Sequence, residues 1–149
     1  MKRYFIVIIL FISQSVGQQY LYNNLDSLKD EFMVIHKEIN SHSTSSNTLK
    51  STLEAIEPLR NLLSLLTLHH SYRRIIIKSD CECSELKESS NNGMSNASKP
   101  TKMWSEGVLL QLDIYKKYSD NNIEKELLER CINNVKLIKQ ELEIQLDSL

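Results

Sequence analysis

The amino-acid sequence predicts an all-α fold, an antiparallel four-helix bundle whose second helix is kinked or split at Pro58 and whose second and third helices are joined by one long loop. Three observations lead to this prediction. Apolar residues recur at intervals of three and four in four separate segments, which is the spacing of one face of a helix. No segment alternates apolar and polar residues as a half-buried strand does. Only 3 of the 149 residues are glycine, too few for a turn-rich all-β fold.

Residues 1–17 have the layout of a secretory signal peptide. A basic start and the unbroken apolar run Tyr4–Ile12 are followed by small residues at Ser15 and Gly17, which suit a cleavage site. The run is too short to cross a bilayer, because a membrane-spanning helix needs about 20 apolar residues. We therefore expect cleavage near Gly17, export of the chain, and a single helical-bundle domain over residues 18–149.

The most regular helical pattern lies near the start of the expected mature chain. Its apolar residues are spaced as in the seam of a packed helix, and polar residues fill the positions between them. They are Leu21, Leu25, Leu28, Phe32, Ile35 and Ile39. The polar segment 41–47 follows this pattern, and we expect it to be a linker.

The second pattern begins at about Thr48, with Ser46 or Asn47 as the N-cap. Pro58 removes one backbone donor and clashes with the preceding turn, so the helix either kinks there or a new helix begins. Beyond Pro58, leucines cover most of the circumference, which is typical of a helix that is central in a bundle or that meets a partner. The β-branched run Ile75–Ile77 could extend this helix.

Residues 79–101 contain few apolar side chains and many Ser, Asn, Glu and Lys, and we expect a long loop there. Loops of this length are uncommon in compact domains and tend to be functional or disordered. The segment holds the only N-glycosylation sequon of the chain, Asn96-Ala97-Ser98. An exposed loop would suit a sugar on Asn96.

Two further helices complete the predicted bundle. The third ends near Ser119, and its apolar stripe consists of Trp104, Val108, Leu109, Leu112 and Tyr115. The fourth runs over residues 123–146 after a short turn, and its stripe consists of Leu127, Cys131, Val135, Ile138 and Leu142.

The lengths of the connections favour antiparallel neighbours. The first predicted helix is about 28 Å long at 1.5 Å per residue, whereas the linker 41–47 spans at most about 25 Å. A parallel return would therefore need a fully taut linker. The turn at residues 120–122 is shorter still. We expect two helical hairpins that dock against each other.

Export would place the cysteines Cys81, Cys83 and Cys131 in an oxidising environment. Cys81 and Cys83 are too close in sequence to form a bond of normal geometry with each other. We therefore expect one of them to pair with Cys131, which closes a loop of about 50 residues worth roughly 4 kcal/mol. The third cysteine then links two chains as a dimer, stays a free thiol, or is buried and idle.

No arrangement of residues indicates a metal site or a catalytic centre. His69 and His70 are adjacent and point about 100° apart on a helix, whereas chelation from one helix needs residues three or four apart; we expect a partly exposed helix face there. Asp80, Glu82 and Glu85 lack the further oxygen ligands of a calcium site. No nucleophile-elbow, phosphate-loop or zinc-protease motif occurs. We therefore expect a protein that is not an enzyme and needs no cofactor.

A group of basic residues is the candidate partner-binding surface. Arg73, Arg74 and Lys78 follow the leucine-rich segment, and Lys116–Lys117 form a second group. If their helices abut, the two groups form one positive surface for an acidic receptor or glycan; otherwise they are ordinary charged surface. Trp104 is either a core anchor or a binding hot spot, and we favour the core.

We therefore expect a secreted, non-enzymatic protein-binding factor. The most specific form of this prediction is a cytokine-like helical ligand for a cell-surface receptor or other extracellular protein. The alternatives are a secreted carrier of a small apolar ligand in a cavity of the bundle, or a secreted inhibitor or effector. A formal net charge of −1 offers no positive field for nucleic acid, and we expect no membrane insertion after signal cleavage. One feature counts against the cytokine-like form: such bundles commonly have long first and third connections, which are short here.

Overall fold

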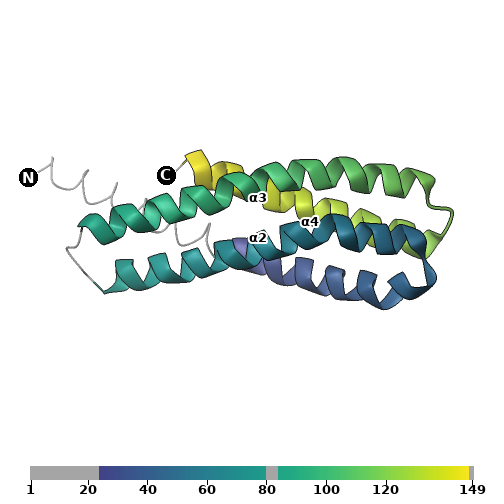
Figure 1. Ribbon diagram of the computed structural model, residues 1–149, viewed down its shortest axis with the longest axis horizontal. Coiled ribbons are helices and arrows are strands. Elements are labelled where there is room, and N and C mark those ends of the chain that lie inside the picture. The colour runs from purple at the N-terminus through teal and green to yellow at the C-terminus, as the bar shows by residue number, and fades with distance from the viewer. Residues whose placement is uncertain (1–23, 80–83, 148–149) are drawn as a thin grey trace, which may run out of the picture.

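The computed structural model describes residues 24–79 and 84–147 and shows four helices that pack against one another (Figure 1). The N-terminal helix is described over residues 24–42, and the short 3-10 turn η1 (Ser43–Ser45) follows it. The remaining helices are α2 (Asn47–Lys78), α3 (Ser84–Tyr118) and α4 (Asn122–Asp147). The described ranges contain no strand. The all-α prediction is therefore confirmed.

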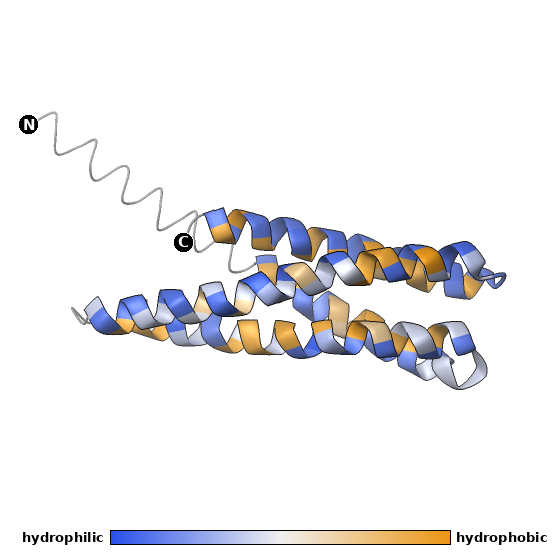
Figure 2. Cartoon of the chain, turned by 45° about the horizontal axis from the view of Figure 1, so that its top comes forward, coloured by the Kyte–Doolittle hydropathy of each residue, from blue (hydrophilic) through white to orange (hydrophobic). Residues whose placement is uncertain are grey.

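The N-terminal helix contributes the apolar face that its sequence pattern predicts. The buried members of the pattern are Leu25, Leu28, Phe32, Ile35 and Ile39; Leu21 lies outside the described residues. Polar and apolar residues recur along every described helix (Figure 2). Because the buried residues are spaced three and four apart, they form one stripe that faces the other helices.

Helix α2 runs without interruption through Pro58, so the predicted split at this residue is wrong. Its N-cap is Ser46, whose hydroxyl accepts a hydrogen bond from the Leu49 backbone at 3.1 Å. A proline inside a helix removes one backbone hydrogen bond. The buried residues Ile56 and Leu59, on either side of Pro58, hold both halves of the helix against the same core. The helix also includes Ile75–Ile77, the β-branched run that could extend it.

The long loop predicted between the second and third helices is not present. Residues 79–101 are helical from Ser84 onward, and α3 continues through Pro100 to Tyr118. The prediction was wrong because the packing face of this segment is made of small side chains that a search for apolar residues misses. The buried residues of α3 are Ser90, Met94, Ala97, Ser98, Thr101, Ser105, Val108 and Leu112.

Hydroxyl side chains can be buried on this face because backbone carbonyl oxygens of the same helix accept their hydrogen bonds. The Thr101 hydroxyl donates to the carbonyl oxygen of Ala97 at 2.7 Å, and the Ser105 hydroxyl donates to that of Thr101 at 2.8 Å. A buried hydroxyl with such a partner avoids the desolvation cost of an unpaired one. These residues therefore act as small core residues and let α3 approach its neighbours closely.

Helix α4 matches its predicted stripe at every position. Leu127, Cys131, Val135, Ile138 and Leu142 are all buried. The side chain of Asn121 caps the helix, since its Oδ1 accepts a hydrogen bond from the Ile123 backbone at 2.8 Å. The turn before α4 thus lies where the sequence predicts it.

Ion pairs between α3 and α4 show how the two helices lie along each other. Lys102 pairs with Glu143 at 3.3 Å, and Glu106 pairs with Lys139 at 3.4 Å. Both pairs therefore join α3 to α4.

The N-terminal helix and α2 are related in the same way. His36 Nε2 is 3.0 Å from Glu57 Oε2, and Arg74 is 3.1 Å from Asp26. These two pairs join the N-terminal helix to α2. The helices lie side by side along the long axis of the molecule (Figure 1).

Candidate functional site

The structure places the residues predicted to contact a partner on two helices, with Arg73, Arg74 and Lys78 on α2 and Trp104 on α3. The guanidinium of Arg74 donates a hydrogen bond to Asp26 on the N-terminal helix at 3.1 Å. Arg73 lines a cleft between α2 and α3. The side chain of Lys78 lies outside the described part of the chain. Arg74 therefore contributes a contact within the bundle as well as surface charge.

Trp104 is not a core anchor, so the favoured prediction for this residue is wrong. Its side chain is 42% exposed, whereas the next residue, Ser105, is fully buried. Small residues form the core face of α3, which leaves the bulky indole beside that face and in contact with solvent. Of the two predictions for Trp104, a surface role is the one compatible with its position.

The two groups of basic residues do not form one positive surface. Lys116 is near the end of α3 and forms an ion pair with Glu129. The α3 residues near Arg73 are Lys87, Ser90 and Asn91, at the start of the same helix. The separation along α3 is on the order of 40 Å at 1.5 Å per residue. Although α2 and α3 do abut, the two basic groups therefore lie too far apart to form one surface.

The side of α2 that points away from the core carries four large apolar side chains. Leu65, Leu68, Tyr72 and Ile75 are 45%, 66%, 47% and 65% exposed, and we call these four residues the α2 outer face. Their spacing of three, four and three is that of a helix-packing seam. Helix α2 thus has a buried seam toward the core and a second, exposed seam. The leucines of α2 predicted a helix that is either central in the bundle or in contact with a partner. The exposed seam shows that α2 is not central.

A similar exposed stripe lies on the second half of α3. Met103, Leu110, Ile114 and Tyr118 are 64%, 70%, 53% and 73% exposed, and we call them the α3 outer face. Gly107 lies in the same row, and a side chain there would meet open space. The apolar residues expected to face the core of the bundle do not include this stripe. The intervals of three and four between these residues are the signal that could have revealed it.

His70 lies in the interior of the bundle, contrary to the partly exposed position expected for it. It is 2% exposed, and its Nε2 is 3.1 Å from the side-chain nitrogen of Gln145 on α4. Burial lowers the pKa of His70 to about 4, although the negative charge of Asp26 acts in the opposite direction. The imidazole is therefore neutral at pH 7, and its Nε2 accepts a hydrogen bond from the amide.

Two further polar residues of α4 are buried against the N-terminal helix. Glu141 accepts a hydrogen bond from Asn24 at 2.7 Å. The amide of Asn134 donates to the backbone carbonyl of Leu28 at 3.1 Å and to Glu31 at 3.3 Å. These bonds fix the position of α4 along the N-terminal helix, because a shift of one turn would leave buried polar groups without partners.

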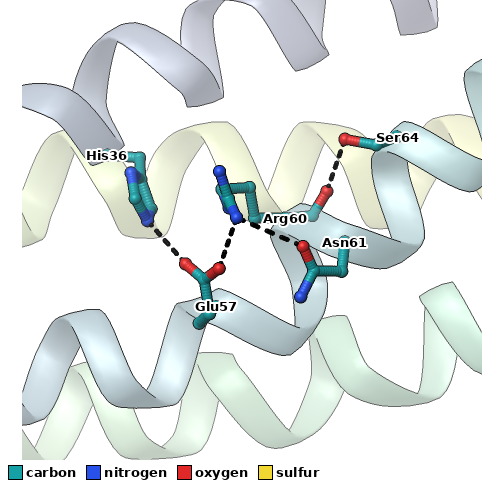
Figure 3. A network of polar contacts seen from close by, with 5 residues as sticks. All are labelled: His36, Glu57, Arg60, Asn61 and Ser64. Carbon is teal, nitrogen blue, oxygen red and sulfur yellow. Dashed lines mark hydrogen bonds and ion pairs between the residues drawn. The ribbon is translucent and has the colours of Figure 1, made fainter.

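Glu57 of α2 lies between two basic side chains (Figure 3). His36 Nε2 is 3.0 Å from one carboxylate oxygen, and Arg60 donates to the other. Burial acts to raise the pKa of Glu57, but the hydrogen bonds from His36 and Arg60 outweigh it and lower the pKa below its ordinary value. These side chains are partly exposed. The network joins the N-terminal helix to α2.

Cys131 is a free thiol in the core. Burial raises its pKa to about 12, so the thiol stays protonated. Its predicted partners, Cys81 and Cys83, lie outside the described residues. The disulfide between Cys131 and one of these two cysteines therefore stays a prediction.

The sequon residue Asn96 is exposed, but it lies in α3 rather than in the expected loop. The third residue of the sequon, Ser98, is fully buried. Glycosylation of Asn96 stays a prediction. In the folded chain the asparagine is accessible and the serine is not.

Within the described ranges, no three His, Cys, Asp or Glu side chains are grouped so that they could hold a metal ion. The described helices also include none whose length and hydropathy would let it span a bilayer.

Comparison with protein families, with curated proteins and with solved structures finds no match for this chain.

Proposed function

We propose that this chain is a secreted, non-enzymatic protein-binding factor and, more specifically, a cytokine-like helical ligand for a cell-surface receptor. In this proposal residues 1–17 are removed on export, and residues 18–149 form one antiparallel four-helix bundle. The observation that carries the proposal is the α2 outer face, a seam of four exposed apolar residues on a helix whose opposite side is fully packed. Exposed apolar patches of this kind mark interaction sites in soluble proteins.

The antiparallel arrangement is supported by the ion pairs between helices. Lys102–Glu143 and Glu106–Lys139 relate α3 to α4 in opposite directions, as the short connection before α4 requires. We also propose that α2 bends at Pro58, because the carbonyl of Glu54 has no proline N–H to bind.

The charges along α2 indicate the chemistry of the partner. Between Pro58 and Ser79 the helix carries no acidic residue, and its charged residues there are all basic. Arg73 and Arg74 lie next to members of the α2 outer face in sequence. A partner surface that is apolar at its centre and acidic at its edge would complement this helix. On α3, Trp104 beside the α3 outer face provides a second candidate contact, since tryptophan is enriched at binding hot spots.

Binding to cells tests this proposal. The full-length chain is produced in a secreting cell line, and the mass of the secreted protein reports whether residues 1–17 have been removed. The fluorescently labelled product is then titrated onto a panel of cell types in the presence and absence of excess unlabelled protein. We expect saturable, competed binding to the surface of at least one cell type. Retention of the chain inside cells, or binding that never saturates, would contradict the proposal.

Sedimentation of the same protein tests whether a second copy covers the α2 outer face instead. We expect a monomer at micromolar concentration. A stable dimer that Leu68→Asp converts to a monomer would assign the face to self-association and overturn the receptor proposal. Saturable binding to a soluble extracellular protein rather than to cells would favour the inhibitor or effector alternative.

A specific measurement also addresses the carrier alternative. Ligand pockets for drug-sized molecules usually exceed about 300 Å³, whereas the α2–α3 cleft measures about 130 Å³. Organic extraction of the secreted protein followed by mass spectrometry would show a bound apolar compound in stoichiometric amount if the chain were a carrier. We expect none.

A further inference from the structure

The residues of the α3 outer face are arranged symmetrically about its middle. Met103 and Tyr118 lie at the two ends, Gly107 and Ile114 each lie four residues inside an end, and Leu110 lies next to the centre. If a second copy lies antiparallel with its Tyr118 opposite Met103, its Ile114 lies opposite Gly107. The two Leu110 side chains then meet near the middle. A surface that matches itself in this way can form a two-fold symmetric contact between identical chains.

The α3 outer face lies on the side of the helix that the bundle leaves open. Val108 and Leu112, on the opposite side of the helix from Leu110, are buried in the core. The second half of α3 runs along an outer edge of the bundle (Figure 1). The face spans residues 103–118, about 24 Å of helix at 1.5 Å per residue. A second helix can therefore lie against it without displacing the core.

Gly107 is an independent indication that another helix approaches this face. Glycine is unfavourable in a helix interior, so its presence there needs a reason. For Gly93 the reason is packing within the chain, because a Cβ atom there would lie 3.0 Å from Nδ1 of His69. Apart from its own turn of helix, no part of the described chain lies within 4 Å of a Cβ atom on Gly107. A helix opposite would supply the reason, since its Ile114 side chain needs this space.

The charges beside the face favour the antiparallel direction. Glu106 and Lys117 are exposed and lie on the same flank of the face. In the antiparallel register, Glu106 lies within two residues, about 3 Å along the helix, of the level of Lys117 on the second copy. Asp113 lies on the same flank but further round the helix than Lys117. A parallel arrangement would instead place each of these charges beside its own copy, which is repulsive.

We propose that a second copy of this chain packs antiparallel against the α3 outer face, about a two-fold axis beside Leu110. The contact is small, because four large apolar side chains per copy form it, whereas a standard interface has about 20–30 residues a side. The association is therefore weak, with a dissociation constant on the order of 100 μM. The chain is a monomer at micromolar concentration and a dimer near millimolar concentration. The α2 outer face takes no part in this contact.

Sedimentation over a range of concentrations that brackets this constant tests the proposal. The secreted chain is measured in reductant, so that no cysteine links two copies. We expect a reversible change from the mass of one chain to that of two. Leu110→Asp, at a position that is 70% exposed, should weaken the association by about tenfold or more.

Two exposed leucines provide matched controls for this variant. Leu137→Asp on α4 and Leu68→Asp on the α2 outer face introduce the same charge, and both should associate as the unmodified chain does. A monomer at every concentration would overturn the proposal. Loss of the dimer in Leu68→Asp rather than in Leu110→Asp would also overturn it, because the contact would then lie on α2.

Engineered cysteines test the direction of the two helices. In a chain with Cys81→Ser and Cys83→Ser, we expect Leu110→Cys to form a disulfide between two copies on mild oxidation. Met103→Cys should not link to itself, because the antiparallel register separates the two copies of this residue by about 22 Å along the helix. A mixture of Met103→Cys and Tyr118→Cys chains should link. Efficient linkage of Met103→Cys to itself would contradict the antiparallel arrangement.

Gly107→Ala tests the close approach with two measurements of opposite sign. At micromolar concentration, where the chain is a monomer, we expect a higher melting temperature, because alanine favours the helix and its methyl group meets open space. At high concentration we expect the association to weaken by about fivefold or more, because the added methyl group overpacks the contact. Unchanged association in this variant would show that no helix approaches Gly107 and would overturn the proposal.

Discussion

His70 on α2 and Gln145 on α4 share a hydrogen bond in the interior of the bundle, 3.1 Å long and formed between residues 75 positions apart in the sequence. The bond requires a neutral imidazole, because a protonated ring has no nitrogen left to accept the amide hydrogen. Burial lowers the pKa of His70 to about 4. The protonation state of one histidine is thus coupled to the packing of two helices.

This coupling predicts that stability falls at mildly acidic pH. In the unfolded chain His70 takes up a proton near the ordinary histidine pKa of 6.5, whereas in the folded chain it does so only near pH 4. The unfolded state therefore binds more protons between these values, and the free energy of unfolding decreases as the pH falls from 6.5 to 4. The total loss is on the order of 3 kcal/mol at 1.36 kcal/mol per pKa unit. Urea unfolding at a series of pH values measures it.

The variant His70→Gln isolates the effect. Its side-chain oxygen can still accept a hydrogen bond from Gln145, but it does not titrate, so the variant should show a shallower pH dependence over this range. His42→Gln, at an exposed position, leaves the His70 contribution in place. Equal slopes for His70→Gln and the unmodified chain would show that the histidine is not buried as described.

Two adjacent leucines test the two seams of α2. Leu66 is fully buried, whereas Leu65 is 45% exposed on the α2 outer face. We expect Leu66→Ala to lower the free energy of unfolding by about 2–5 kcal/mol, because it leaves a cavity in the core. Leu65→Ala should cost less than about 1 kcal/mol. Chemical denaturation of both variants gives the comparison, and similar losses would mean that the α2 outer face is itself covered.

The small side chains on the buried face of α3 lead to a further prediction. Ser105 is fully buried, so Ser105→Leu should destabilise the fold by about 1–3 kcal/mol through overpacking. Gln111→Leu, at an exposed position of the same helix, should change stability by less than about 0.5 kcal/mol. Thermal unfolding followed by circular dichroism distinguishes the two. A harmless Ser105→Leu would indicate that this part of α3 does not pack on the core.

Cys131 should be unreactive in the folded chain. Thiolates rather than thiols react with disulfide reagents, and burial raises the pKa of Cys131 to about 12. In a variant with Cys81→Ser and Cys83→Ser, we expect labelling of Cys131 to be slow in buffer and fast in denaturant. Peptide mapping of the unmodified secreted chain without reductant provides the complementary result. A disulfide bond at Cys131 in that map would contradict the buried free thiol described here.

The sequence predicts most of the N-terminal helix and α4 because their core residues are large and apolar. Phe32, Ile35, Val135 and Ile138 fall at helical spacing and are all buried. The first half of α3 is missed by such a search, since residues such as Thr101 pack by being small and by bonding to their own helix.

The candidate site is harder to predict than the fold. Leucines cover α2 on both sides, so composition cannot tell the inner seam from the α2 outer face; only the contacts of the folded chain do. The same holds for His70 and Trp104, whose positions depend on how neighbouring helices meet. The basic character near Arg73 is visible in the sequence, whereas its cleft depends on α3 being helical at Ser90.

The affinity of two matched variants for the cell surface tests the central claim most directly. Leu68→Asp places a charge on the α2 outer face, where Leu68 is 66% exposed, and Leu137→Asp places the same charge on α4, where Leu137 is 48% exposed. Both variants should fold. We predict that Leu68→Asp weakens saturable cell binding by about tenfold or more, as expected for a residue at a binding centre, and that Leu137→Asp leaves it unchanged. Equal binding by the two variants would contradict the assignment of recognition to α2.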